Sequence, residues 1–148
     1  MNVRIRLMNI NDYDKVYKLW LSCKGMGLNN LDDSKEGIDK FLKRNPETCF
    51  VAEEKDEIVG VILAGNDGRR GHIYHTAVSP NYRKKGIGRN LVIQAMNALK
   101  NLGINKTNLV VFSNNIEGNL FWEKLGFSQR NDLIYRDKLI NEMEKINT

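Results

Sequence analysis

A run of three cations and two glycines, RKKGIG at residues 83–88, has the residue types needed to bind an anion. Arg83, Lys84 and Lys85 supply positive charge. Gly86 and Gly88 remove the Cβ atoms that would hold a phosphate oxygen away from the peptide N–H groups. A run of apolar residues at helical spacing follows directly. Because a helix N-terminus exposes unpaired N–H groups and the positive end of the helix dipole, this stretch predicts a phosphate-binding turn.

The segments on either side of this turn are the ones that such a site requires. Residues 72–78 have the composition of a strand, and apolar residues recur at helical spacing from Ile87 to Leu102, where Gly103 would end the helix. The turn is not a dinucleotide GxGxxG motif because position 91 is leucine, and no Gly-Lys-Ser or Gly-Lys-Thr of a Walker loop is present. We therefore expect a pyrophosphate-bearing ligand of a third kind.

Apolar periodicity and turn residues predict the elements that position this turn. Strands are expected at residues 3–8, 48–53, 58–64, 72–78 and 107–112, with one or two closing strands at 128–139. Helices are expected from a cap at residues 11–12 through Cys23, around Ile38 to Leu42, at 87–102 and at 116–125. The order βααβββαβαβ predicts an α/β fold: a mixed, mostly antiparallel sheet with helices on both faces.

Composition narrows the class of protein. A chain of 148 residues with 41% hydrophobic and 28% charged residues is expected to form one domain, 1–148. No apolar run reaches the roughly 20 residues of a membrane helix and no signal peptide is evident, so we expect a cytoplasmic protein. Cys23 and Cys49 are too isolated for a zinc site or a disulfide framework and are expected to be buried thiols. A net charge of +5 favours anionic partners.

Two sequence blocks resemble the GNAT (Gcn5-related) N-acetyltransferase family. Residues 83–88 match the family pattern [RQ]-x-x-G-x-[GA] and follow a family-like AVSPNYR at 77–83. The second block consists of Asn115 and, at the usual distance, FWEKLGF at 121–127. The expected element order agrees as well, so the resemblance covers nearly the whole chain.

The resemblance implies that the chain binds acetyl-CoA. The backbone at Ala77 and Val78 would pair with the pantetheine arm, Asn115 would hydrogen-bond the same arm, and Trp122 could be core or could line the coenzyme tunnel. The pyrophosphate would be held by the N–H groups of Lys85, Gly86, Ile87, Gly88 and Arg89. The side chains of Arg83, Lys84, Lys85 and Arg89 could reach phosphate oxygens.

The implied reaction is direct attack of an amine on the thioester, with the Val78 N–H facing the developing oxyanion. Many relatives carry a tyrosine acid where this chain has Trp122. The relatives that acetylate ribosomal proteins tend to carry a glutamate on the strand that here reads Leu109-Val110-Val111. Candidates for the base are Tyr74 and His75. Strand alternation would put His72, Tyr74 and Thr76 on one face and Ile73 with His75 on the other.

The expected activity is acetyl transfer to a primary amine of a small molecule or a peptide. Acidic residues at the substrate edge, Asp32, Asp33 and Glu36, would draw in the amine or merely cap a helix. Alternatives are a ribosomal-protein-type N-terminal acetyltransferase and a non-catalytic coenzyme-A-binding module. Nucleic acid is not an expected partner, because RKKGIGRN holds no aromatic residue. A membrane is not expected either, because no apolar run is long enough to span one. Relatives often pair through their C-terminal strands, so a homodimer is a further expectation.

Overall fold

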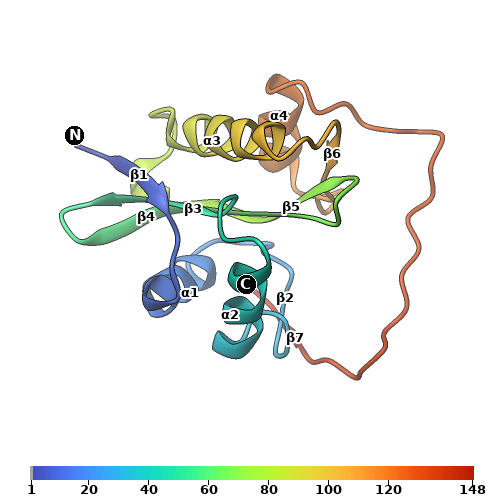
Figure 1. Ribbon diagram of the computed structural model, residues 1–148, viewed down its shortest axis with the longest axis horizontal. Coiled ribbons are helices and arrows are strands. Elements are labelled where there is room, and N and C mark those ends of the chain that lie inside the picture. Colours follow the sequence, from blue (N-terminus) through green and yellow to red (C-terminus); the bar gives the residue numbers. More distant parts are fainter. Residues whose placement is uncertain (1) are drawn as a thin grey trace.

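The computed structural model describes residues 2–148 and has a five-stranded sheet at its centre (Figure 1). The strands are β1 (Arg4–Leu7), β3 (Phe50–Glu54), β4 (Glu57–Asn66), β5 (Gly71–Val78) and β6 (Thr107–Asn108). They lie in the order β1-β3-β4-β5-β6, with antiparallel neighbours except for the parallel pair β5 and β6. The predicted mixed, mostly antiparallel sheet is therefore confirmed.

Two helices cover each face of this sheet, as predicted (Figure 1). On one face lie α1 (Tyr13–Leu21) and α2 (Lys35–Arg44), and on the other lie α3 (Ile87–Asn101) and α4 (Ile116–Lys124). Because successive strand residues point to opposite faces, β4 supplies both cores: Val61 and Leu63 pack with Val16 and Trp20 of α1, whereas Ile62 packs with Leu91 of α3.

The helix ends follow from local chemistry. Asn9 and Asp12 form a capping box around the short 3-10 helix η1 (Ile10–Asp12), from which α1 continues, and the hydroxyl of Ser34 accepts from the Gly37 N–H at the start of α2. Gly103 and Gly126 follow α3 and α4 with φ of 82° and 91°, so both glycines end their helices as predicted.

The C-terminal part differs from the expectation. Strand β6 covers only residues 107–108 of the predicted 107–112, and the closing strands predicted at 128–139 do not form. Residues 128–142 are exposed along their whole length (Figure 1). The apolar residues of this segment were not enough to make a strand, because a strand also needs a neighbour for its peptide groups.

A second, two-stranded sheet holds the end of the chain. Strand β7 (Lys145–Ile146) pairs antiparallel with β2 (Leu28–Asn29) in the loop between α1 and α2. The Asn30 N–H also donates to the Glu144 carbonyl at 3.0 Å, and the Asn30 side chain accepts from the Glu144 N–H. Neither strand was predicted from the sequence. Within residues 2–148, no helix is both long and apolar enough to cross a membrane.

Candidate active site

Strand β5 has an unpaired edge on the side away from β4. It pairs with β6 only at Gly71 and His72, so residues 73–78 have no neighbouring backbone strand there within the described part of the chain; we call these residues the open edge of β5. The Ser79 N–H donates to Val59 of β4 at 2.8 Å. Because ladder hydrogen bonds alternate along an antiparallel strand, the peptide groups of Val78 point away from β4, toward the open edge.

The same alternation turns the peptide groups of Ala77 toward Val61 of β4, with which Ala77 is paired. Of the two residues predicted to pair with a pantetheine arm, Val78 is therefore the one whose backbone N–H and C=O point to the open edge. The Ala77 side chain is buried in the core below α1.

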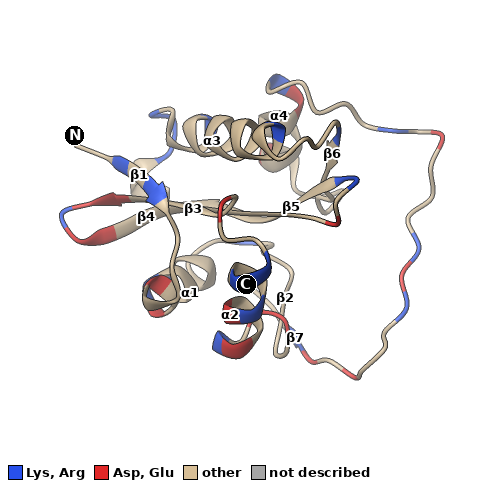
Figure 2. Ribbon diagram, in the orientation of Figure 1, with Lys and Arg blue, Asp and Glu red and all other residues tan. Residues whose placement is uncertain are grey.

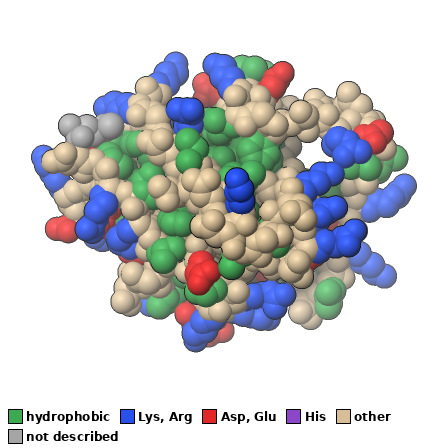
Figure 3. Space-filling view, turned by 45° about the horizontal axis from the view of Figure 1, so that its top comes forward, with side chains coloured by type: hydrophobic (Ala, Val, Ile, Leu, Met, Phe, Trp, Pro, Cys, Tyr) green, Lys and Arg blue, Asp and Glu red, His purple; other side chains and the backbone are tan. Residues whose placement is uncertain are grey.

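The cationic turn lies between the open edge of β5 and helix α3. After the short 3-10 helix η2 (Pro80–Tyr82), residues 83–86 are exposed, and the backbone of Lys84 and Gly86 is left-handed, with φ of 60° and 84°. Arg83, Lys84 and Lys85 place their charges here (Figure 2). On the face drawn in Figure 3, Lys and Arg outnumber Asp and Glu. This placement suits an anionic ligand.

The first amides of α3 are free to bind that anion. The first hydrogen bond of the helix runs from the Asn90 N–H to the Gly86 carbonyl, at 3.0 Å. The N–H groups of residues 85–89 have no acceptor within residues 2–148. No acidic residue lies in the first turn, and Arg89 is exposed there. The residues predicted to hold a pyrophosphate thus come together at one helix end.

The two glycines of the turn serve different purposes. Gly86 is the residue before α3; a Cβ there would meet nothing within 4 Å, but its φ of 84° is one that side chains rarely adopt. Gly88 is buried, and a Cβ on it would lie 3.1 Å from the ring of Phe121 in α4. The sequence interpretation assigned both glycines to phosphate approach. The structure shows that Gly88 also allows α4 to pack against α3.

The Arg83 side chain is exposed but bonds to the end of β5. Its Nε donates to the Val78 carbonyl at 3.2 Å, and its Nη2 lies 3.6 Å from Sγ of Cys23 at the end of α1. Cys23 also contacts the Val78 carbonyl at 3.8 Å. Both cysteines are free and buried, as predicted, and burial raises the pKa of the Cys49 thiol to about 12.

A hydrogen bond to the side chain of Glu54 anchors the cationic turn to the β3–β4 hairpin. The Tyr82 hydroxyl donates to the Glu54 carboxylate at 3.0 Å, and this bond raises the pKa of the phenol. The Lys85 ammonium lies 5.6 Å from the centre of the Tyr82 ring. Sequence reasoning missed Tyr82, although its position within PNYRKKG could have signalled a role in holding the turn.

His75 lies on the opposite face from the one predicted. Two residues of β5, His75 and Thr76, face the single residue Ile62 of β4, so the strand carries a bulge at this point. Ile73 packs toward α3, whereas the His75 ring packs edge-on against Trp20 of α1, 5.2 Å between ring centres. The expectation that Ile73 and His75 share a face was therefore wrong, because a bulge inverts the alternation that follows it.

The imidazole of His75 is held by a buried carboxylate. Its Nε2 lies 2.7 Å from Oδ1 of Asp33, a residue only 3% exposed at the start of α2. Asp33 Oδ2 accepts from the Asn29 N–H at 2.8 Å, which fixes the carboxylate. Because a carboxylate only accepts, the Nε2–H of His75 donates, which leaves Nδ1 as the proton acceptor of the ring. Asp33, expected to draw in an amine or cap a helix, is instead the partner of His75.

Tyr74, the other candidate base, packs edge-on against Phe41 of α2 and beside His72. Partial burial raises the pKa of its phenol, so Tyr74 remains protonated near neutral pH. His72 is bonded to Asn108 at the far end of the strand. Of the three polar rings on β5, His75 is the one with a free acceptor nitrogen and a carboxylate partner.

The second sequence block forms the start and body of α4. The Asn115 Oδ1 accepts from the Gly118 N–H at 2.9 Å and caps the helix, so its Nδ2 remains as the donor for a ligand. Trp122 is half-buried between Phe121 and Phe127, with ring centres 5.0 and 5.1 Å away. Trp122 is thus part of the α3-side core.

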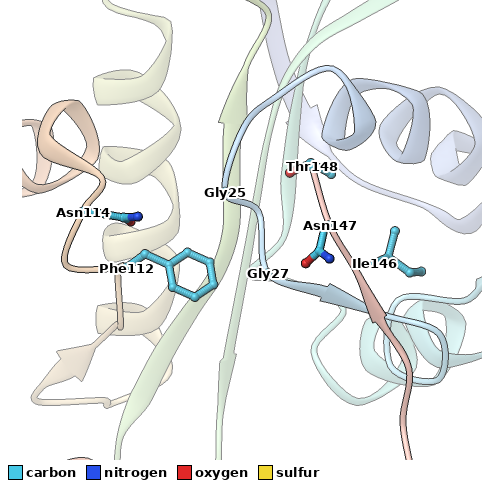
Figure 4. A pocket seen from close by; sticks show the side chains of 7 residues that line it. All are labelled: Gly25, Gly27, Phe112, Asn114, Ile146, Asn147 and Thr148. Atoms are coloured by element: carbon cyan, nitrogen blue, oxygen red, sulfur yellow. The ribbon is translucent and has the colours of Figure 1, made fainter.

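A cavity of about 290 Å³ opens where three segments meet: the loop after α1, the loop before α4 and the C-terminal residues (Figure 4). The Phe112 ring reaches the loop after α1, where a Cβ on Gly27 would lie 3.4 Å from the ring. The lining residues are Gly25, Gly27, Phe112, Asn114, Ile146, Asn147 and Thr148. Cys23, two residues before Gly25, contacts the Val78 carbonyl, so the loop that lines the cavity reaches the end of the open edge. Phe112 and the C-terminal residues were not foreseen from the sequence.

Comparisons with known proteins agree with the fold. A family model described as the acetyltransferase (GNAT) family matches residues 13–127. An acetyltransferase of Sodalis glossinidius is 32% identical over 143 residues, 96% of this chain and 99% of the relative. Ard1 from Thermoplasma volcanium superposes with a TM-score of 0.77 at 21% identity, covering 86% of this chain and 84% of Ard1. PaiA N-acetyltransferase from Thermoplasma acidophilum, solved with coenzyme A, gives 0.76 at 21%, covering 86% and 91%.

Proposed function

Because this chain belongs to the GNAT acetyltransferase family, whose members use acetyl-CoA, we propose that it transfers an acetyl group from acetyl-CoA to a primary amine, with His75 as the general base. The observation that carries the assignment of the base is the hydrogen bond between His75 and the buried Asp33. Acetyl-CoA supplies an activated acetyl group as a thioester.

The donor would lie along the open edge of β5 and across the start of α3. Val78 offers an N–H and a C=O to an extended, amide-bearing arm, in the manner of an added strand. The free amides of residues 85–89 and the exposed cations of the turn suit a pyrophosphate, and the open space at Gly86 leaves room for it. Arg83 would have to leave the Val78 carbonyl to reach a phosphate oxygen.

The acceptor would enter through the cavity at Gly25 and Gly27. The exposed Asp32, near the bonded pair of His75 and Asp33, provides negative charge for an incoming cationic amine. Along a strand, His75 and Val78 are separated by about 10 Å. His75 Nδ1 would therefore accept the amine proton through an intervening water rather than directly.

The Val78 N–H is the donor that would face the developing oxyanion. No residue of the described chain is assigned as the acid that protonates the departing sulfur. Trp122 offers only an indole N–H, which can hydrogen-bond a thiolate but cannot protonate it at neutral pH.

The test is release of the coenzyme A thiol in the presence of a panel of small amines and peptides. We expect turnover with at least one amine, and a loss in kcat of between about 10²- and 10⁴-fold for His75→Ala, the usual range for a general base. Binding of coenzyme A, measured by calorimetry, should stay unchanged in this variant. His72→Ala is the matched control, because it removes the other imidazole of the same strand.

Each contrary result has a separate meaning. Binding of coenzyme A without turnover on any amine would favour a non-catalytic coenzyme-A-binding module. Turnover that survives in His75→Ala would remove the base assignment and leave the donor site standing. Failure to bind coenzyme A at all would reject the proposed function.

A further inference from the structure

Two side chains of the protein itself contact the Val78 carbonyl, which points to the open edge of β5. The Nε–H of Arg83 donates to this oxygen at 3.2 Å, and Sγ of Cys23 contacts the same oxygen at 3.8 Å. A carbonyl oxygen has two lone pairs, so these two contacts take both of its acceptor positions. An extended arm that pairs with the Val78 carbonyl in the manner of an added strand must therefore displace one of the two side chains.

Arg83 is the side chain that can leave. Cys23 is only 4% exposed, and its N–H donates to the Trp20 carbonyl at 3.0 Å, so Cys23 cannot move unless the end of α1 shifts. The Arg83 side chain is exposed and belongs to the cationic turn. It lies two residues before Lys85, whose N–H is the first of the amides without an acceptor at the start of α3. Rotation of the Arg83 side chain alone can bring the guanidinium to that helix end.

A diphosphate would be a stronger partner for Arg83 than the groups it contacts in the structure. The Val78 carbonyl is neutral, and the second contact of the guanidinium, from Nη2 to Sγ of Cys23, is 3.6 Å long. The ion pairs within residues 2–148 do not include Arg83. A phosphate group is charged and can accept from two N–H groups of one guanidinium at once. A diphosphate at the start of α3 would therefore draw Arg83 away from Val78.

We propose that Arg83 is a switch in the donor site. Its guanidinium covers the Val78 carbonyl until a diphosphate binds at the start of α3, and it then moves to the diphosphate and uncovers the carbonyl for the amide-bearing arm. The diphosphate end of the coenzyme thus opens the site for the other end. This inference rests on the donor site of the proposed function, and it adds that one side chain links the two halves of that site.

The switch predicts effects of opposite sign on the two halves of the coenzyme. If Arg83 only bound phosphate, removing its guanidinium would weaken the binding of ADP and leave the binding of pantetheine unchanged. If Arg83 also covers Val78, the same change weakens the binding of ADP but strengthens that of pantetheine, because pantetheine no longer competes for the carbonyl. A side chain that only held the fold together would give no gain in affinity when it is removed.

The first experiment measures the binding of ADP and of pantetheine separately, from the shifts of amide NMR signals during titration. Arg83→Met keeps the apolar stem and removes the guanidinium. We expect the Kd of pantetheine to fall between about twofold and tenfold, the range for one exchanged hydrogen bond, and the Kd of ADP to rise. Lys85→Met is the matched control, because it removes a cation of the same turn that lies over the Tyr82 ring. It should raise the Kd of ADP and leave that of pantetheine unchanged.

The second experiment is a crystal structure of the wild type with ADP alone. We expect the guanidinium on the diphosphate and beyond hydrogen-bond distance of the Val78 oxygen. Arg83 still bonded to Val78 beside bound ADP would overturn the proposal. A Kd of pantetheine that is unchanged or raised in Arg83→Met would overturn it too. Circular dichroism checks that the variants are folded, and Arg83→Ala should shift both Kd values in the same directions as Arg83→Met.

This proposal and the proposed function fail in different ways. Binding of both fragments without the opposite shifts overturns the switch and leaves the donor site standing. Failure of ADP, pantetheine and coenzyme A to bind at all rejects the proposed function, and the switch with it. Neither experiment depends on acetyl transfer, so loss of turnover alone does not affect the switch.

Discussion

At the scale of single residues, Asp33 determines which nitrogen of His75 is free. Asp33→Asn keeps an oxygen for the Asn29 N–H but turns an NH₂ group toward Nε2 of His75. The imidazole would then carry its proton on Nδ1, so it could no longer accept a proton there. We expect kcat to fall between about 10²- and 10⁴-fold, with the KM for acetyl-CoA unchanged.

Steady-state kinetics on Asp33→Asn, beside a thermal melt, checks this. A purely structural role for Asp33 would lower the melting temperature and affect kcat only through the amount of folded protein. A variant that keeps its wild-type kcat per folded molecule would contradict the assignment.

Gly86 and Gly88 should respond differently to the same change. In Gly86→Ala the new methyl group meets no neighbour but forces a left-handed alanine at the anion site, at a cost of about 1–2 kcal/mol. We expect coenzyme A to bind roughly tenfold more weakly, since the turn must shift, and the free energy of unfolding to fall by no more than this strain. Calorimetry with coenzyme A measures this.

In Gly88→Ala the methyl group meets the Phe121 ring. We expect a loss of about 1–3 kcal/mol in the free energy of unfolding, typical of an overpacked site. Denaturant unfolding of the two variants side by side separates the effects. Equal losses of coenzyme affinity and of stability in both would mean that the two glycines serve one purpose.

At the scale of elements, strands β1 and β3 are joined by ion pairs that depend on pH. Hydrogen bonds from Arg6 and Arg4 lower the pKa of Glu53 from 4.5 to about 2. Burial opposes ionisation of Asp12, but its bonds to Arg6 outweigh burial and also lower its pKa. A carboxyl whose pKa is lower in the folded state stabilises the fold above its unfolded pKa, and this stabilisation is lost as pH falls through the folded pKa.

The melting temperature should therefore fall as pH decreases from about 5 toward 2. Arg6→Met should flatten this dependence, because it removes the shared partner of both carboxyls. Lys43→Met serves as control: it breaks only the exposed pair with Asp39 on α2, and such pairs contribute little. An equally steep pH dependence in Arg6→Met would show that other groups cause it.

The sequence predicted those elements whose signals are local. Helices α1 to α4 have apolar periodicity together with caps or terminal glycines, and the strands before the cationic turn have β-rich composition, so all of these were found. The bulge at His75 was missed because it depends on how β5 aligns with β4, which its own residues do not reveal. The bond between Asp33 and His75 was missed for a similar reason, because it joins residues that are close only after folding.

Segment 128–139 shows the limit of composition as a guide. Its residues favour a strand, but strand formation depends on a partner, and no strand within residues 2–148 pairs with it. Composition also cannot reveal that β7 pairs with β2, because two-residue strands leave almost no pattern.

At the scale of the whole molecule, the last residues of the chain contribute to the proposed acceptor site. Ile146, Asn147 and Thr148 line the cavity at Gly25 and Gly27, and the Met26 N–H donates to Oγ1 of Thr148 at 3.1 Å. Deleting residues 144–148 should enlarge this cavity and free the loop at Gly25 to Gly27 from its contacts with the C-terminal residues. We expect the KM for the amine to rise several-fold, while the affinity for coenzyme A stays the same.

Initial rates across a range of amine concentrations, with calorimetry for coenzyme A, check this. Lys145→Ala is the control, since it keeps the backbone pairing of β7 and removes an exposed side chain. An unchanged KM in the truncated chain would place the acceptor away from the C-terminal residues.

The extra residue in β5 decides on which face of the sheet the His75 imidazole lies. If Thr76 were deleted, the ladder with β4 would become regular, and His75 would turn to the side of the sheet where α3 packs, while Ala77 and Val78 would keep their places. Deletion of this single residue would thus move the histidine from its contact with Asp33 into the core on the opposite face of the sheet. The rest of the sequence and the overall shape would stay the same.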